Sequence, residues 1–335
     1  MKLDPRCTYC LMSRVLYQCN LSTKDPELTN KVVKACLVKM GEEYDPKRTS
    51  TYVGTIVHRT CYEVLNDSDP YRHIKEENNK TALKMLPAVR KLIYGTNENG
   101  EAHSFESSPK SPTEIFEKAI LAAVIGNYFD FGIMGLDSSD EEFEKEFNAF
   151  FEEGLAVDDT KEMLPLLTNV VYIIDNCGEI VFDREVMDII KKIQAGTIKN
   201  NDKGGGTGSE IGSETSGETS GKAPKLTLVV RGAPILTDAT MKDAKELNME
   251  TVSDAILTTG SNAIGVCIKE LPPETLTAIE EATLIISKGM ANYESLSDEN
   301  FGAVIFLLRT KCEAVAESLK IGRNLSVAKF VNRPR

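Results

Sequence analysis

The 335-residue sequence lacks several features that would assign it to a common class of protein. No apolar run approaches the ~20 residues that a membrane span requires. The opening MKLDPRCTYC lacks the apolar core of a signal peptide. Positive charge is scarce, because 39 Lys and Arg face 51 Asp and Glu, for a formal net charge of −12. We therefore expect a soluble cytoplasmic protein whose main partner is neither nucleic acid nor an anionic membrane, since both require a concentrated positive face.

Histidine and cysteine are also sparse. His58, His73 and His103 all fall in the first third of the chain, so a metal ion bound in the second half would need mainly oxygen ligands. Eight cysteines in a chain of this length do not make a disulfide scaffold. Cys7 and Cys10 have the CxxC spacing of a metal or redox site, but a single pair is equally consistent with two packed, reduced thiols.

The first half of the chain is helical in pattern. Apolar residues recur at spacings of three and four in segments 49–67, 78–95, 111–135 and 138–154. In the last of these, Ser139 and Glu142 have the spacing of a capping box, and a stripe of Phe residues follows. Its many acids could suggest a metal site, but a solvated polar face opposite a Phe-packed face is the simpler interpretation.

After about residue 165 the pattern changes to short, nearly continuous apolar runs, typical of strands buried on both faces of a parallel sheet. These runs are 169–176, 225–232, 254–260, 282–289 and 303–309. Amphipathic helical segments are predicted at 183–194, 239–248, 273–281 and 311–319, and the tail 324–332 could add an edge strand. The sequence thus predicts an all-helical domain at 1–165 and a doubly wound, mostly parallel, Rossmann-like α/β/α domain at 166–335.

Residues 196–224 interrupt the α/β pattern with Gly, Ser, Thr and Glu and almost no apolar side chains. The stretch GGGTGSE does not complete a phosphate-binding loop, because no Gly-Lys-Ser/Thr follows it. We interpret the segment as a disordered surface insertion without a role in function.

Polar residues follow the predicted strands, where an open parallel sheet binds its ligands. Each has an ordinary alternative: Thr237 or Asp238 could cap a helix, Asn could serve in turns, and Lys288 could be a solvated surface charge. Taken together, carboxylates and amides without a nearby His favour a divalent ion such as Mg²⁺ or Mn²⁺, and a Lys opposite favours an anionic group such as phosphate. The strand-end residues are Asp175, Asn176, Glu179, Arg231, Asp238, Asn262, Lys288, Asn292 and Glu294.

Four segments, in order, resemble the metal-dependent damage-control phosphatase family, long catalogued as a domain of unknown function. These segments are DNCGEIVFD, RGAPILTDATMKDA, SKGMANYESL and LLRTKC. AAVIGNYFDFG in the helical half is similar to the family's Gly-Asn-x-x-Asp helix, and CTYC with the later Lys-Cys is similar to its prokaryotic-type branch. The resemblance implies hydrolysis of phosphate monoesters on small, often damaged metabolites, sugar phosphates included, with Co²⁺, Mn²⁺, Ni²⁺ or Mg²⁺.

The resemblance also implies roles for individual residues. Asp175, Asn176 and Asp238 would hold the metal, and Asp175, Asp238 and Glu179 are the candidate catalytic residues. With Asn262 from the strand-end pattern, the candidate substrate- and phosphate-binding residues are Lys288, Asn292, Glu294, Arg231, Asn127 and Asp130. The branch likeness suggests that Cys7, Cys10 and Cys312 converge as a thiol cluster. Thr237 departs from the Asn that many relatives carry before the metal-binding Asp.

Two other functions stay open at this point. Relatives in this family have been proposed to methylate carboxyl groups with S-adenosylmethionine, but the Gly-rich first-strand loop usual for that cofactor is missing. A non-catalytic metal- or metabolite-binding protein, or a sensor built on Cys7 and Cys10, is the third interpretation. Aspartyl-phosphate chemistry of the haloacid-dehalogenase type is disfavoured, because Asp175 is followed by Asn-Cys and not by an Asp-x-Asp pair.

Overall fold

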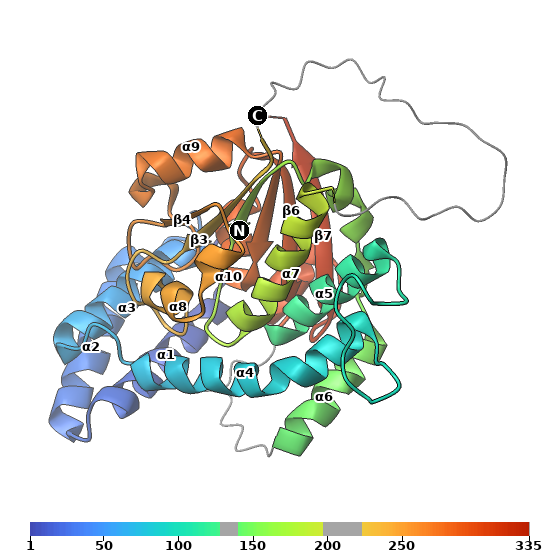
Figure 1. Ribbon diagram of the computed structural model, residues 1–335. Helices are drawn as coiled ribbons and strands as arrows, with labels where there is room; N and C mark the ends of the chain where they lie inside the picture. Colours follow the sequence, from blue (N-terminus) through green and yellow to red (C-terminus); the bar gives the residue numbers. More distant parts are fainter. Residues whose placement is uncertain (128–139, 197–222, 335) are drawn as a thin grey trace.

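The computed structural model describes residues 1–127, 140–196 and 223–334. Within them lies a seven-stranded sheet with helices on both faces, joined to a group of N-terminal helices (Figure 1). The predicted fold class, α/β plus α, is confirmed. Among the described helices, none is long and apolar enough to cross a membrane. The predicted division at residue 165 stays a prediction, as does disorder of 196–224, most of which lies outside the described residues.

The helices fall close to the predicted segments, with three additions. The helices are α1 Arg6–Ser22, α2 Pro26–Glu43, α3 Ser50–Leu65, α4 Arg72–Tyr94, α5 Pro112–Gly126, α6 Asp140–Glu153, α7 Glu179–Gln194, α8 Met241–Glu246, α9 Pro273–Glu281, α10 Gly289–Leu296 and α11 Glu313–Leu319. Three 3-10 turns are η1 Thr160–Leu166, η2 Met249–Thr251 and η3 Ile268–Glu270. The periodicity of the sequence did not predict α1, α2 or α10. Ser139 of the predicted capping box lies outside the described residues.

Local chemistry explains several of the helix starts. Asp25 caps α2 by accepting the Glu27 N–H, with Pro26 at the first helical position. Ser111 caps α5 in the same way, through the Glu114 N–H. Helix α5 is buried over nearly its whole length, because it packs between the sheet and α7.

All five predicted strands form, and their order places the site. The strands are β1 Val157–Asp158, β2 Asn169–Ile173, β3 Lys225–Val230, β4 Ala255–Thr258, β5 Leu284–Lys288, β6 Gly302–Arg309 and β7 Ser326–Arg333. Their order in the sheet is β1-β7-β6-β5-β2-β3-β4, and only the β6–β7 pair is antiparallel. The tail strand β7 is therefore not the edge strand, because the short β1 pairs with its outer side.

The two faces of the sheet bury two different cores. Along β2, Val170 and Tyr172 contact the core shared with α4, α5 and α7. Val171 and Ile173 alternate with them and contact the core shared with α9, α10 and α11. This two-residue period is what a strand covered on both faces requires.

Helices α1, α2 and α3 form a third core of their own. Figure 1 shows them gathered at one end of the molecule, with α4 running from them towards α5 and α6. The Tyr62 hydroxyl of α3 accepts the Leu236 N–H at 2.9 Å, and Ile235 inserts into the third core. The loop after β3 thus attaches the helical group to the carboxyl ends of the strands.

Candidate metal centre at the strand ends

The carboxyl ends of β2 and β5 meet where the order of the strands reverses. From β2 the chain proceeds outward through β3 to the edge strand β4, and then returns to β5 on the opposite side of β2. Open α/β sheets bind ligands at such a switch point. Asp175 follows β2 and Lys288 ends β5, so two predicted site residues lie there.

The loop after β2 pairs with the loop after β3. Asn176 and Asp238 form an antiparallel bridge, and the Ala239 N–H donates to the Asp175 carbonyl at 2.8 Å. The Thr237 hydroxyl donates to Asn176 Oδ1 at 2.7 Å. These bonds bring together the three residues that were predicted to hold a metal ion.

Neither Thr237 nor Asp238 caps the following helix. The N-cap of α8 is Thr240, whose side chain and backbone complete a capping box with Asp243. The helix-capping alternative for Thr237 and Asp238 is therefore wrong: the Thr237 hydroxyl binds Asn176 in the loop after β2, and the Asp238 carboxylate accepts from Arg231.

Arg231 connects the two carboxylates. It follows β3 and is almost fully buried. Its Nε donates to Asp238, and its Nη2 lies 3.6 Å from Asp175 Oδ1. The same guanidinium donates to Asn292 Oδ1 at 2.8 Å and to the Gly265 carbonyl at 2.6 Å. Arg231 thus holds the ends of β2 and β3, and the start of α10, around one point.

Glu179 is the first residue of α7 and contacts the loop after β2. Its Oε1 accepts the Asn176 N–H at 2.7 Å and the Asn127 amide at 3.1 Å. The Asn127 amide also lies 3.3 Å from Asp175 Oδ2. Asn127 is the C-cap of α5, so the helical half of the chain contributes a side chain here, and its predicted role in substrate binding stays a prediction. Asp130, its predicted companion, lies outside the described residues.

Lys288 is fully buried, so its side chain does not reach solvent. Its Nζ donates to Asp183 Oδ1 at 2.6 Å, to the Ala123 carbonyl at 2.9 Å and to Glu179 Oε2 at 3.2 Å. Burial opposes the ammonium form, but the charges of Asp183 and Glu179 outweigh it and raise the pKa of Lys288. The solvated-surface alternative for Lys288 is therefore wrong.

These contacts define a buried cluster whose charge is not balanced. Its four carboxylates face two cations, which leaves a formal charge of −2. Uncompensated buried charge is costly, so this excess favours binding of a cation. The strand-end cluster consists of Asp175, Glu179, Asp183, Asp238, Arg231 and Lys288.

The pKa shifts reflect this imbalance. Burial raises the pKa of Asp175 well above its usual value, and the charges of Asp238 and Glu179 raise it further. Burial also raises the pKa of Asp238, against the opposing effect of Arg231. Burial raises the pKa of Asp183 to about 6.

Lys311 was not among the predicted site residues. It follows β6, and its charge lowers the pKa of Asp175, so it lies near the cluster. Its side chain is half-buried, and within the described part of the chain its Nζ has no hydrogen bond or ion pair. Extending the strand-end rule to β6 would have found it, whereas no sequence signal sets apart Asn79, whose amide oxygen accepts the Gly178 N–H at 2.7 Å.

The donor set fits a divalent ion. Across residues 1–127, 140–196 and 223–334, no three Asp, Glu, His or Cys side chains form a ready metal site. The predicted metal ligands are not a set of that kind, because they consist of two carboxylates, from Asp175 and Asp238, and the amide oxygen of Asn176. Oxygen donors of this kind suit Mg²⁺ or Mn²⁺. Together with the excess negative charge, they make these three residues the ones that would hold the ion.

Two predicted residues lie apart from the cluster. Asn262 Oδ1 accepts the Arg59 Nε–H at 2.8 Å, which joins the loop after β4 to α3. Glu294 accepts the Ser50 hydroxyl at the start of α3, and burial raises the pKa of Glu294. Both side chains therefore hold the helical group against the strand ends.

The three predicted thiols lie on α1 and at the start of α11, and their convergence as a cluster stays a prediction. Cys7 and Cys10 lie in α1, Cys312 is the N-cap of α11, and all three are free. Arg6 donates to Glu317 at 2.6 and 3.0 Å, which joins these helices. Burial raises the pKa of both Cys7 and Cys312, and Cys312 adds to the effect on Cys7.

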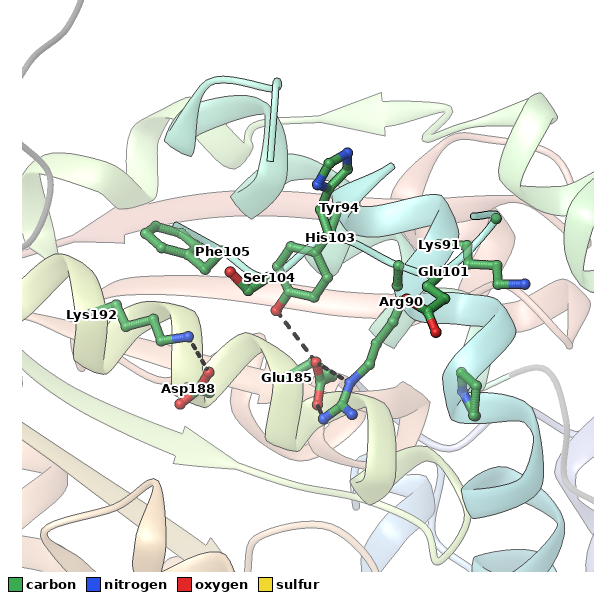
Figure 2. A pocket seen from close by; sticks show the side chains of 13 residues that line it. Arg90, Lys91, Tyr94, Glu101, His103, Ser104, Phe105, Glu185, Asp188 and Lys192 are labelled. Carbon is green, nitrogen blue, oxygen red and sulfur yellow. Dashed lines mark hydrogen bonds and ion pairs between the residues drawn. The ribbon is translucent and has the colours of Figure 1, made fainter. Parts of the chain in front are cut away.

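A separate hollow of about 540 Å³ lies between α4, residues 100–105 and α7. Figure 2 shows two ion pairs among its charged side chains, Arg90 with Glu185 and Lys192 with Asp188. Arg90 and the Tyr94 hydroxyl donate to Glu185, and Lys192 pairs with Asp188 at 3.0 Å. None of the predicted site residues lines this hollow, and the Arg90–Glu185 pair joins α4 to α7.

Comparisons with known proteins agree with the motif resemblance. The family model of the damage-control phosphatase ARMT1-like domain matches residues 3–198 and 218–327 and passes over the glycine-rich stretch between them. A damage-control phosphatase of Archaeoglobus fulgidus is 35% identical over 99% of this chain and 100% of its own. One of Pyrococcus horikoshii is 25% identical over 98% and 97%. The crystal structure of a DUF89 family protein of P. horikoshii covers 100% of both chains with a TM-score of 0.77 at 24% identity, which shows the same fold.

Proposed function

Because the chain belongs to the damage-control phosphatase ARMT1-like family, we propose that it is a metal-dependent phosphatase acting on phosphate monoesters of small metabolites. The names of its relatives in A. fulgidus and P. horikoshii support the reaction class. The observation that carries the proposal is the buried strand-end cluster, with its excess of negative charge at the switch point of the sheet. Damaged or side-product metabolites, sugar phosphates included, are the substrate class that we propose.

Asp175, Asn176 and Asp238 would hold the divalent ion in this proposal. A bound ion of this kind supplies polarisation of a phosphoryl oxygen and a bound water of lowered pKa. Mn²⁺, Co²⁺, Ni²⁺ and Mg²⁺ are the candidates. The bonds of Arg231 to Asn292 and the Gly265 carbonyl keep its guanidinium beside both carboxylates.

The other residues of the site divide the remaining work. Glu179 fixes the Asn176 backbone and the Asn127 amide, so it orients one of the proposed metal ligands. Lys311 is the cation that we assign to the phosphate group, since its Nζ forms no bond among the described residues and its charge reaches Asp175. The three N–H donors of Lys288 are all engaged inside the protein, so we assign it no contact with the substrate and a supporting role through Glu179.

Release of inorganic phosphate from a panel of phosphate monoesters, with each of the four ions, tests this function. We expect release by the wild type and a loss of at least about a hundredfold in kcat for Asp175→Asn and Asp238→Asn. Asp188→Asn is the matched control, because Asp188 lies on α7, is 38% exposed and pairs with Lys192. Equal turnover by all four proteins, or no release from any ester, would reject the assignment.

A further inference from the structure

The Lys288 ammonium forms all of its hydrogen bonds with groups inside the protein. Its three bonds, to Asp183, to the Ala123 carbonyl and to Glu179, measure 2.6, 2.9 and 3.2 Å. An ammonium group has three N–H donors, so none remains for a substrate oxygen. Lys288 therefore reaches the loop after β2 through the groups that it holds, and of these Glu179 is the one that contacts Asn176.

Asp183 makes the shortest of these three bonds. It lies on α7 one turn after Glu179, so both carboxylates face Lys288 from the same side of the helix. The Tyr172 hydroxyl donates to the same oxygen, Oδ1, at 2.7 Å. The second oxygen, Oδ2, is buried and has no hydrogen-bond partner among the described residues. A buried carboxylate with an unpaired oxygen is costly, and packing alone does not require one at this position.

These contacts form a continuous series from Tyr172 in β2 to Asn176 in the loop after β2. Tyr172 holds Asp183, Asp183 holds Lys288, and Lys288 holds Glu179 Oε2. The other oxygen of Glu179 accepts the Asn176 N–H at 2.7 Å. If the Asp183 charge is lost, the ammonium keeps only one carboxylate, and Glu179 is drawn towards it.

We propose that Asp183 is a positioning residue of the site, which fixes Lys288 and through it holds Glu179 against Asn176. This inference rests on the proposed phosphatase function, because only there does the placement of Asn176 affect turnover. Asp183 touches neither of the proposed metal-binding carboxylates and is not expected to contact substrate.

Hydrogen exchange at the Asn176 backbone amide tests the inference without any substrate. Asp183→Asn keeps the shape of the side chain and removes its charge, and Asp188→Asn on the same helix is the matched control. We expect the Asn176 amide to exchange at least about tenfold faster in Asp183→Asn, and within about twofold of the wild type in the control. The Val171 amide, inside β2, is expected to keep its rate in both. An unchanged Asn176 amide, or equal acceleration at Val171, would overturn the positioning role.

Steady-state kinetics on a hydrolysed ester separate this role from a merely structural one. We expect kcat of Asp183→Asn to fall about 10- to 100-fold with KM changed less than about threefold, under conditions where circular dichroism shows both proteins fully folded. Tyr172→Phe should move kcat in the same direction by less, because Asp183 still holds Lys288. If the wild type and Asp188→Asn hydrolyse no ester, the phosphatase function fails while the exchange result still decides the role of Asp183. Equal kcat in Asp183→Asn and the wild type would reject the positioning role alone.

Discussion

Gly289 lies so close to Asp175 that a β-carbon on Gly289 would overlap the Asp175 carboxylate. Gly289 starts α10 directly after β5 with φ +78°, a conformation that favours glycine. The carboxylate at the end of β2 thus rests against the backbone at the end of β5. This contact places Asp175 at the switch point and leaves no room for a side chain on its neighbour.

Gly289→Ala is expected to damage both stability and activity. The added methyl group must displace the Asp175 carboxylate, and the positive φ adds backbone strain. We expect the free energy of unfolding to fall by about 1–3 kcal/mol and phosphate release to fall more than about tenfold. Gly41→Ala is the control: no atom lies within 4 Å of a β-carbon there, and in α2 the change should be neutral or stabilising. Wild-type kinetics in Gly289→Ala would contradict the close contact.

Asp175→Asn is expected to stabilise the protein in the absence of metal ions. Burial and the charges of Asp238 and Glu179 raise the pKa of Asp175, so its ionised form costs folding free energy at neutral pH. An amide removes that cost, and we expect a gain of about 1 kcal/mol or more in urea unfolding of chelator-treated protein. Added Mn²⁺ should stabilise the wild type but not the variant. A variant that unfolds more easily than the metal-free wild type would contradict the charge imbalance.

His58 is expected to make the α1–α3 group sensitive to acid. It is buried in α3, its Nδ1 accepts the Gln18 amide at 2.6 Å, and burial lowers its pKa to about 3 from 6.5. Below pH 6.5 the unfolded chain takes up a proton that the folded protein refuses, so stability is full above this pH and is lost as the pH falls towards 3. The full loss from this group amounts to about 5 kcal/mol.

Urea unfolding between pH 7.5 and pH 4 measures this effect. His58→Gln should flatten the pH dependence, whereas His73→Gln, whose side chain is 86% exposed, should leave it as in the wild type. The same slope in His58→Gln as in the wild type would show that other groups cause the loss of stability.

Deletion of residues 199–217 is expected to leave the enzyme intact. The family model passes over these residues and resumes at 218, so they lie outside the part of the chain that matches the family. We expect kcat/KM and the urea midpoint of the deletion variant to match those of the wild type within experimental error. A loss of activity at an unchanged midpoint would assign the segment a role that its composition does not indicate.

The strand ends could be predicted from the sequence because each depends on local chemistry. An apolar run such as 169–176 ends where polar residues begin, and parallel strands bring such ends to one edge. Asp175, Asn176 and Asp238 therefore met as expected. Asn262 and Glu294 did not join them, because their side chains bind residues of α3, and their predicted role in substrate binding stays a prediction.

What the sequence could not provide depends on contacts between distant segments. The bridge between Asn176 and Asp238 joins two loops whose pairing no local pattern encodes. The burial of Lys288 follows from α5 and α7 closing over it, and a lysine at a strand end is otherwise expected to reach solvent. Helix α10 was not predicted, because it begins at the residue after β5 and no turn or loop residues separate the two elements in the sequence.

Phosphate release by chelator-treated protein during titration with Mn²⁺ tests the central claim most directly. The account predicts negligible release without the ion and a saturable rise with added Mn²⁺ in the wild type. It predicts no rise in Asp175→Asn or Asp238→Asn, which lack one of the two carboxylates proposed to hold the ion. Full activity in the chelator-treated wild type, or an equal Mn²⁺-dependent rise in both variants, would contradict it.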